Sequence, residues 1–292
     1  MAVPDHAFDR FAASHRPGLE DELRRALPEA SPASLARAVS DAVLSPGKRF
    51  RPLVALAAGE LAGAPVETAG AVAVATEFVH AASLVLDDLP SMDDARRRRG
   101  RPALHLVHGT ATAELVSVLL MARAFEIVAG APGASPAIRA RLTRELSQAV
   151  EACCSGQADD LGARPEALRL EDLESIHARK TGALFVAAVR GGAIAGGARE
   201  PALEALTRFA RNVGLAFQIT DDLLDLEGDA EAMGKDPARD GHRANFARLL
   251  GAESSRRLVE ELSAAAAEAL SPLGRRAATL ADLARVVRER RA

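Results

Sequence analysis

The sequence predicts an all-α protein, chiefly because of its composition. Alanine, leucine and arginine are abundant among the 292 residues, whereas aromatic residues make up 3% and tryptophan and tyrosine are absent. The abundant residues favour helices, and the scarce aromatic residues favour strands. Hydrophobic residues at 48% and charged residues at 26% suffice for the buried core of a soluble protein. The net charge of −3 provides no general attraction for nucleic acid or an anionic membrane.

Proline and glycine interrupt the helical patterns at fairly regular intervals, for example at residues 28–32 and 130–133. Each interruption is short, and the composition is similar on both sides of it, so none resembles a linker between domains. We therefore expect one large helical domain over residues 1–292. The expected helices cover residues 5–26, 32–44, 49–62, 67–89, 103–129, 136–161, 170–195, 200–227, 243–270 and 274–290.

Cys153 and Cys154 are the only cysteines, and their adjacent positions suit neither a disulfide framework nor a zinc site. We interpret both as thiols that line the core of a protein in a reducing compartment. The N-terminus has no basic segment followed by an apolar core. No stretch reaches the roughly 18 uninterrupted apolar residues of a membrane span. The sequence therefore predicts a cytoplasmic protein without a membrane span.

Two clusters of aspartates give the first indication of function, and each lies at the end of an apolar run. Crowded carboxylates repel one another, and their burial without partners is costly. Mg²⁺ binds oxygen ligands and shares its remaining sites with water and substrate phosphates, so two clusters suggest a diphosphate substrate. One cluster alone could be a solvated helix end, but the presence of both weakens that interpretation. The clusters consist of Asp87, Asp88, Asp93 and Asp94, and of Asp221, Asp222 and Asp225.

Polar residues precede the first cluster along one face of a predicted helix. Thr76, His80, Ser83 and Asp87 follow the spacing i, i+4, i+7 and i+11. His80 should therefore lie about 10 Å from Asp87 along the helix axis. A lone histidine on an apolar helix is usually a structural group. Because His80 shares its face with the aspartate cluster, we favour a functional role for it.

In the second cluster, Asp221 and Asp225 are one helical turn apart and should point the same way. Asp222 is rotated by about 100° and could reach a metal only through water or a bend in the helix. Gln218 precedes Asp222 by one turn, at the mouth of the same region.

Basic residues occur near both clusters. A run from Arg96 to Arg101 follows the first cluster, and although such runs are most often solvated, arginine also binds phosphate oxygens in pairs. Lys48 and Arg51 lie at the start of a helix, where anions are favoured. Two separate basic groups predict two anionic substrates or one large one. Further lysines are Lys180, inside an apolar helix, and Lys235, fourteen residues after Asp221.

Five segments together resemble the trans-polyprenyl diphosphate synthases over nearly the whole chain. The resemblance implies an all-helical fold with a central cavity, usually in a homodimer. It also implies that three Mg²⁺ ions bind between the two aspartate clusters and the diphosphate of an allylic substrate. In the family's order, the segments are GKRFRP (47–52), EFVHAASLVLDDLPSMDDARRRRGRPALH (77–105), KTGALF (180–185), GLAFQITDDLLD (214–225) and MGKD (233–236).

The resemblance also implies individual roles, and the activity is condensation of an allylic diphosphate with isopentenyl diphosphate. The oxygens of Thr181 and Gln218 match groups that stabilise the carbocation, and Lys180 joins these two in the expected catalytic set. The matches to metal ligands are Asp87, Asp88, Asp93, Asp221, Asp222 and Asp225. The matches to residues that bind the allylic diphosphate are Arg98, Lys180 and Lys235. The matches to residues that bind isopentenyl diphosphate are Lys48, Arg51, His80 and Arg99.

Product length in such enzymes depends on the residues four or five positions before the first aspartate, where an aromatic side chain blocks growth. Here these positions hold Ser83 and Ala82, both small. The segment around them is most similar to bacterial geranylgeranyl diphosphate synthases, which implies a twenty-carbon product, with Phe78 as a candidate floor of the cavity. Farnesyl diphosphate is the alternative. One departure is Arg243, where the family usually has lysine, and we expect modestly altered allylic binding.

Alternatives from other classes explain less of the sequence. The pairs Glu77 with His80 and Glu174 with His177 have the ExxH spacing of ferritin-like di-iron proteins. That interpretation leaves both aspartate clusters and every basic motif unexplained. Terpene cyclases usually have a different second metal motif. A noncatalytic partner subunit tends to lose one aspartate motif, and both are present here.

Overall fold

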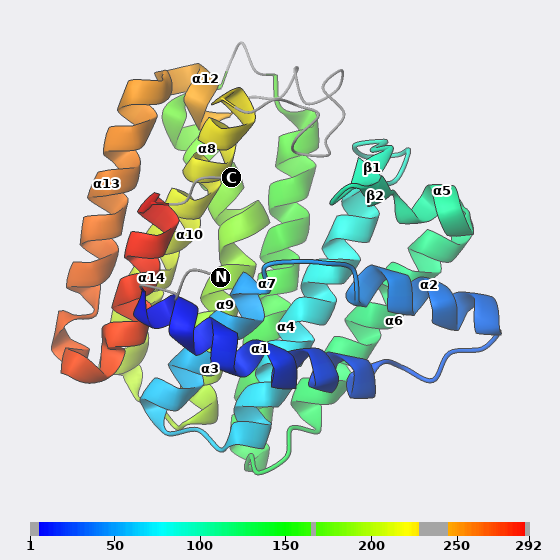
Figure 1. Ribbon diagram of the computed structural model, residues 1–292, viewed down its shortest axis with the longest axis horizontal. Coiled ribbons are helices and arrows are strands. Elements are labelled where there is room, and N and C mark those ends of the chain that lie inside the picture. Colours follow the sequence, from blue (N-terminus) through cyan, green and yellow to red (C-terminus); the bar gives the residue numbers. More distant parts are fainter. Residues whose placement is uncertain (1–5, 165–167, 228–244, 290–292) are drawn as a thin grey trace.

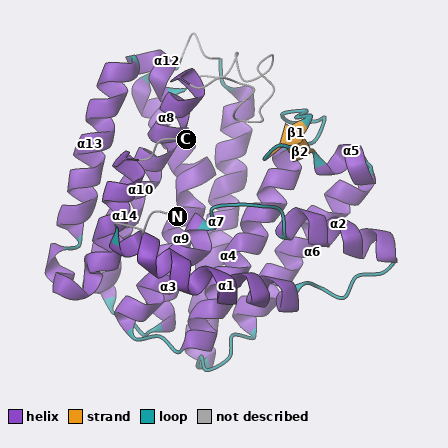
Figure 2. Cartoon of the chain, viewed as in Figure 1, coloured by secondary structure: helices purple, strands orange, loops and turns teal. Residues whose placement is uncertain are grey.

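The computed structural model describes residues 6–164, 168–227 and 245–289, and it confirms the all-α prediction (Figures 1 and 2). The described residues form helices almost throughout, with one short antiparallel strand pair. The elements are α1 (Ala7–Ala26), α2 (Ala33–Val43), α3 (Phe50–Ala62), α4 (Val66–Asp87), β1 (Arg97–Arg98), β2 (Arg101–Pro102), α5 (Leu104–His108), α6 (Thr110–Ala129), α7 (Pro136–Gly162), α8 (Leu170–His177), the π segment η2 (Ala178–Gly182), α9 (Ala183–Ala195), α10 (Glu200–Glu227), α12 (Phe246–Leu250), α13 (Ala252–Ala269), the 3₁₀ segment η3 (Ser271–Ala277) and α14 (Ala278–Glu289).

The long helices form a bundle around α4, which packs against α3, α6 and α9 (Figure 1). Helix α10 packs against α9 and α13. The final turns of α4 and α10 lie at the same end of the bundle as the β1–β2 hairpin, at the top of Figure 1. Because the second aspartate cluster occupies the final turns of α10, and the first occupies the end of α4 and the loop that follows it, the fold brings both to one end of the molecule.

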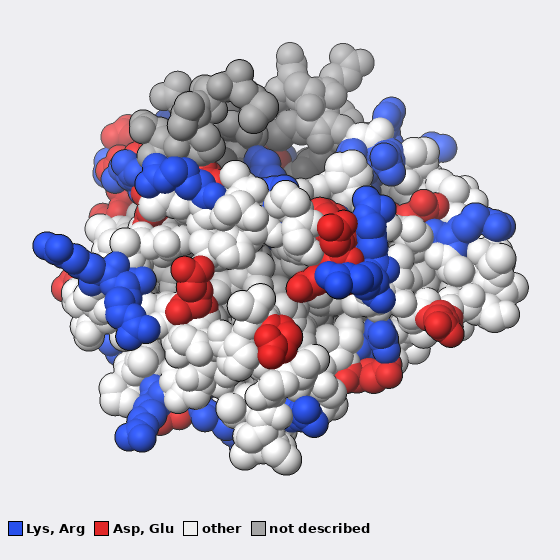
Figure 3. Space-filling model, turned by 60° about the horizontal axis from the view of Figure 1, so that its bottom comes forward, with Lys and Arg blue, Asp and Glu red and all other residues white. Residues whose placement is uncertain are grey.

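Helix α4 lies in the core and is apolar along most of its length. By length and composition alone it could cross a membrane, but 72% of its most apolar stretch is buried inside the molecule, as expected of a core helix. On the face shown in Figure 3, basic and acidic side chains are intermingled among wide uncharged areas.

Two glycines allow helices to approach each other closely. A Cβ on Gly192 of α9 would lie 2.1 Å from the carbonyl oxygen of Ala55 in α3. A Cβ on Gly156 of α7 would lie 2.3 Å from the backbone nitrogen of Lys180 in η2. Real Cβ atoms do not approach other atoms so closely, so glycine permits both contacts.

Several predicted boundaries were wrong in detail. The helix expected over 103–129 ends and restarts at Gly109, where φ is 85°, and the one expected over 243–270 is broken at Gly251, where φ is 78°. A π segment interrupts the helix expected over 170–195. The β1–β2 pair was not predicted. Its turn, Arg99-Gly100, has positive φ at both residues, as a two-residue hairpin turn requires.

The cysteines differ in exposure, which corrects one prediction. Cys153 is half-buried against the core, and burial raises the pKa of its thiol to about 11. Cys154 is exposed and does not line the core, because it is one residue further along α7 and faces outward. The single domain over residues 1–292 stays a prediction.

Candidate active site

The loop after α4 folds back on the helix end and completes the first aspartate cluster. The backbone N–H of Asp93 donates to the carbonyl of Asp87 at 2.9 Å, and that of Ala95 donates to the carbonyl of Asp88 at 3.2 Å. Burial raises the pKa of Asp87 to about 6. The charge of Lys180 opposes that rise, and the carboxylate of Asp93 adds to it. The site therefore holds a half-buried carboxyl group beside a like charge.

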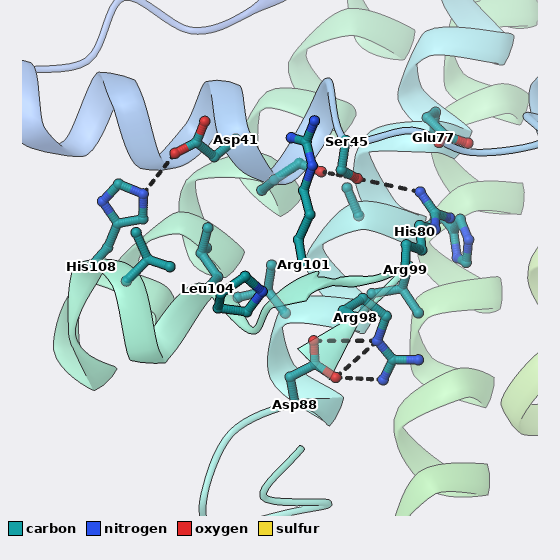
Figure 4. Close-up of a pocket in the computed structure, with 16 residues that line it drawn as sticks. Asp41, Ser45, Glu77, His80, Asp88, Arg98, Arg99, Arg101, Leu104 and His108 are labelled. Atoms are coloured by element: carbon teal, nitrogen blue, oxygen red, sulfur yellow. Dashed lines mark hydrogen bonds and ion pairs between the residues drawn. The ribbon is translucent and has the colours of Figure 1, made fainter. Parts of the chain in front are cut away.

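The hairpin returns Arg98 to the second aspartate of this cluster (Figure 4). Arg98 Nε donates to Asp88 Oδ1 at 2.9 Å, and a second guanidinium nitrogen of Arg98 also bonds this carboxylate. Asp88 is 3% exposed, and burial raises its pKa although Arg98 opposes the change. Arg98 thus neutralises a carboxylate that the sequence predicts as a metal ligand.

Three of the four residues predicted to bind isopentenyl diphosphate lie near one another. Arg51 Nη1 is 3.5 Å from His80 Nε2, and the charges of Arg51 and Arg99 both act on the ring. Burial and these guanidiniums hold the pKa of His80 well below its usual range, so His80 is neutral at pH 7. Arg99 Nη1 donates to the carbonyl of Pro46 at 3.1 Å. The fourth residue, Lys48, instead lines a surface pocket between α1, α3 and α14.

The second cluster connects to η2 through Gln218. Asp222 Oδ1 accepts from Gln218 Nε2 at 2.8 Å, and Asp222 Oδ2 accepts from the backbone N–H of Phe246 at 2.8 Å. Gln218 Oε1 in turn accepts from the hydroxyl of Thr181 at 3.2 Å. Because Asp222 holds the amide nitrogen, Gln218 presents its oxygen to Thr181. Burial raises the pKa of Asp222 to about 6.

The other two aspartates of this cluster are more open. Asp221 is half-buried and Asp225 is exposed. The negative charge of Asp221 acts on the guanidinium of Arg51. The second cluster therefore lies within electrostatic range of the basic group on α3.

The π segment carries Lys180 and Thr181, and π insertions of this kind often occur at functional sites. Lys180 Nζ bonds Asp160 Oδ2 at 2.5 Å while its charge acts on Asp87. Sequence reasoning missed Asp160, although the adjacent acidic pair Asp159-Asp160 at the end of α7 was a signal. His177 is buried beside the ring of Phe246, and burial lowers its pKa to about 4.

The residues expected to set product length occupy different faces of α4. Ser83 is half-buried and donates to the carbonyl of His80 at 2.9 Å, whereas Ala82 is fully buried. Phe78 is also fully buried, and it lies nine residues before Asp87, about half a turn around the helix. The structure therefore does not place Phe78 on the face that carries Asp87. Lys235 and Arg243 lie outside the described residues.

The two aspartate clusters have the chemistry of a site for hard divalent cations. Every predicted ligand is a carboxylate, and burial raises the pKa of Asp87, Asp88 and Asp222, so a cation would offset the loss of hydration. Among the described residues, no three His, Cys, Asp or Glu side chains are gathered closely enough to hold a metal by themselves.

Comparisons with known proteins identify the family. The family model for polyprenyl synthetase matches residues 32–266. The chain belongs to the polyprenyl synthetase family. It is 41% identical over 271 residues to geranylfarnesyl diphosphate synthase, chloroplastic, of Leucosceptrum canum, covering 90% of this chain and 74% of that protein. It is 42% identical over 259 residues to a probable farnesyl diphosphate synthase of Bradyrhizobium diazoefficiens, covering 85% and 77%.

A third relative and a solved structure extend this result. Geranylgeranyl pyrophosphate synthase 12, chloroplastic, of Arabidopsis thaliana is 40% identical over 257 residues, covering 85% of this chain and 71% of that protein. The polyprenyl synthase of Caulobacter crescentus, complexed with calcium and isoprenyl diphosphate, superposes with a TM-score of 0.87 at 26% identity and covers all of both chains. As a polyprenyl synthetase, the protein is a prenyltransferase with the isoprenoid synthase fold.

Family membership and one ion pair exclude the di-iron class considered above. Glu77 bonds Arg49 at 2.6 Å, so it is not available to a di-iron centre in this structure. The di-iron interpretation is therefore wrong. The names of the relatives include products of different lengths, so farnesyl and geranylgeranyl diphosphate both stay candidates.

Proposed function

We propose that this prenyltransferase condenses an allylic diphosphate with isopentenyl diphosphate, with Mg²⁺ as its metal and geranylgeranyl diphosphate as its main product. The observation that carries the proposal is the arrangement of two cationic groups around the carboxylates. The charge of Lys180 acts on Asp87, while the guanidiniums of Arg51 and Arg99 act on the neutral ring of His80 and form the other group. Two anionic substrates, each with its own cations, account for both groups.

The six aspartates would hold Mg²⁺, with three ions expected per site. Bound Mg²⁺ would act as a Lewis acid on the leaving diphosphate and favour loss of that group from the allylic carbon. Asp222 would act through water or after releasing a bond, because both of its oxygens accept hydrogen bonds within the protein. Arg98, now paired with Asp88, would turn to the diphosphate as the ligands assemble.

The remaining site residues bind and orient the substrates. Lys180 and Arg98, together with Lys235 and Arg243 from outside the described residues, would bind the allylic diphosphate. Arg51, His80 and Arg99 would bind isopentenyl diphosphate, and Lys48 would join them after reorientation. The oxygens of Thr181 and Gln218 would lie beside the developing carbocation, in an orientation that Asp222 fixes. The apolar walls of the bundle would exclude water that could quench the cation.

The small residues at positions 82 and 83 support a twenty-carbon product, because neither narrows the space next to Asp87. A fifteen-carbon product is the second candidate, favoured by the similarity to a probable farnesyl diphosphate synthase. We further propose a cytoplasmic homodimer. Exposed apolar side chains on the neighbouring helices α5 and α6 support self-association, since subunit interfaces cover such side chains. They are Leu106, Val107, Leu115 and Val118, each 53–67% exposed.

The test is incubation of the protein with Mg²⁺, isopentenyl diphosphate and, separately, dimethylallyl, geranyl and farnesyl diphosphate. Chromatography of the dephosphorylated products should show a twenty-carbon alcohol. A product that stops at fifteen carbons would keep the reaction and refute the product length. The absence of condensation with every starter would refute the proposed activity and favour a noncatalytic partner subunit.

A further inference from the structure

A buried ion pair between Arg49 and Glu77 lies close in sequence to Arg51 and His80, two of the residues predicted to bind isopentenyl diphosphate. Arg49 is 4% exposed and adopts a left-handed conformation with φ of 52°. Its guanidinium donates to Glu77 Oε1 at 2.6 Å and to Glu20 Oε1 at 2.8 Å. It also donates to the carbonyls of Val43 and Ser45, both at 3.0 Å. Arg49 is therefore fully engaged inside the protein and is unavailable to a substrate.

This ion pair joins the two halves of the predicted diphosphate site. Arg49 lies two residues before Arg51, in the loop that begins α3. Glu77 lies three residues before His80 on the adjacent helix α4, so both side chains emerge on nearby faces. The bond between Arg49 and Glu77 thus sets the position of Arg51 relative to His80, whose side chains are 3.5 Å apart.

Glu77 also has an oxygen that the ion pair does not use. The carboxylate is 2% exposed, and Oε2 accepts no hydrogen bond from any described residue. Burial lowers the pKa of Arg51 and of Arg99, and the charge of Glu77 is the foremost influence opposing this in both. Two guanidiniums beside a histidine repel each other, and the negative charge of the nearby Glu77 carboxylate offsets that repulsion without a hydrogen bond to either.

We propose that Glu77, anchored by Arg49, is a positioning residue that holds Arg51 and Arg99 where they can bind the diphosphate of isopentenyl diphosphate together with His80. This inference rests on the proposed function. Burial raises the pKa of Glu77, and the charges of Arg49, Arg99 and Arg51 oppose that rise. As the ion-paired carboxylate, Glu77 would repel the diphosphate and so would not bind it directly. Its contribution is to keep the two guanidiniums near each other before the substrate arrives.

Steady-state kinetics of Glu77→Gln tests the inference, because glutamine keeps the volume and an acceptor for Arg49 but removes the charge. We expect the KM for isopentenyl diphosphate to rise about tenfold, the effect of weakening roughly one charge-assisted hydrogen bond. The KM for geranyl diphosphate should change less than about twofold. An unchanged or lower KM for isopentenyl diphosphate would overturn the inference. Inactive wild-type protein would instead refute the proposed function.

Glu20→Gln is the matched control. Glu20 also bonds Arg49, but its charge is not among the main influences on the pKa of Arg51 or Arg99. The Glu20→Gln variant should have a lower thermal unfolding midpoint than the wild type and unchanged KM values for both substrates. If the effect of Glu77→Gln were a general loss of structure, both variants would show the same change in KM, and that result would overturn the inference. If Glu77→Gln fails to fold, Arg49→Lys should raise the KM for isopentenyl diphosphate selectively, because lysine cannot make the same set of bonds. If Arg49→Lys changed the KM for geranyl diphosphate as much as the KM for isopentenyl diphosphate, the inference would also be overturned.

Discussion

At the scale of single residues, protein groups already pair with much of the charge in the site. Arg98 binds Asp88, Lys180 binds Asp160, and Asp222 binds Gln218 and the backbone of Phe246. These pairs stabilise buried charges that would otherwise lack partners. Substrate binding would therefore replace these hydrogen bonds and ion pairs within the protein by contacts with the diphosphate and the metal.

The buried imidazole of His177 predicts a dependence of stability on pH. Its pKa falls from 6.5 to about 4 on folding because burial disfavours the charged form. Between these values the unfolded chain takes up a proton and the folded protein does not, so stability falls as the pH drops through this window. At pH 5 the loss relative to pH 8 is about 2 kcal/mol.

Urea unfolding of the wild type and of His177→Gln at pH 8 and pH 5 measures this contribution. The raised pKa values of Asp87 and Asp222 act in the opposite direction, but they do so in both proteins, so the difference isolates His177. The wild type should lose about 2 kcal/mol more than the variant. Equal losses in the two proteins would show that His177 becomes protonated in the folded state.

At the scale of elements, η2 positions the chemistry because α7 approaches it so closely. Replacement of Gly156 by alanine would place a Cβ 2.3 Å from the backbone of Lys180. The overpacking should cost about 1–3 kcal/mol and displace Lys180 and Thr181. We expect kcat to fall at least about tenfold. Gly162→Ala, whose Cβ meets no atom within 4 Å, is the control and should retain full activity. Full activity in Gly156→Ala would show that the close contact between Gly156 and Lys180 does not position the catalytic residues.

Periodicity and composition predicted most helices but not how they are interrupted. Ala and Leu patterns located α3, α4 and α10 to within a few residues, because those helices bury continuous apolar faces. The π insertion in η2 and the turn at Arg99-Gly100 depend on tertiary contacts, namely those of Gly156 and of the loop before α3. The burial of Arg49 could not be predicted from the sequence either. Nothing in the basic motif at residues 47–52 distinguishes this buried arginine from the residues predicted to bind a substrate.

At the scale of the whole molecule, the space beside α4 should determine product length. Ser83 lies one turn before Asp87 on nearly the same face, so a larger side chain there would block a growing chain. Ser83→Phe should shift the main product from twenty carbons to fifteen or fewer, as chromatography of the dephosphorylated alcohols would show. Ser83→Ala should leave the product unchanged. An unchanged product in Ser83→Phe would place the limiting residues on other helices.

The central claim is that the two aspartate clusters, which begin 134 residues apart at Asp87 and Asp221, act together on one metal-bound diphosphate. Calorimetric titration of an unreactive thiolo analogue of geranyl diphosphate, with and without Mg²⁺, tests it most directly. The account predicts binding that requires Mg²⁺ in the wild type and is lost in both Asp87→Ala and Asp221→Ala. Tight binding without Mg²⁺, or loss in only one of the two variants, would contradict it.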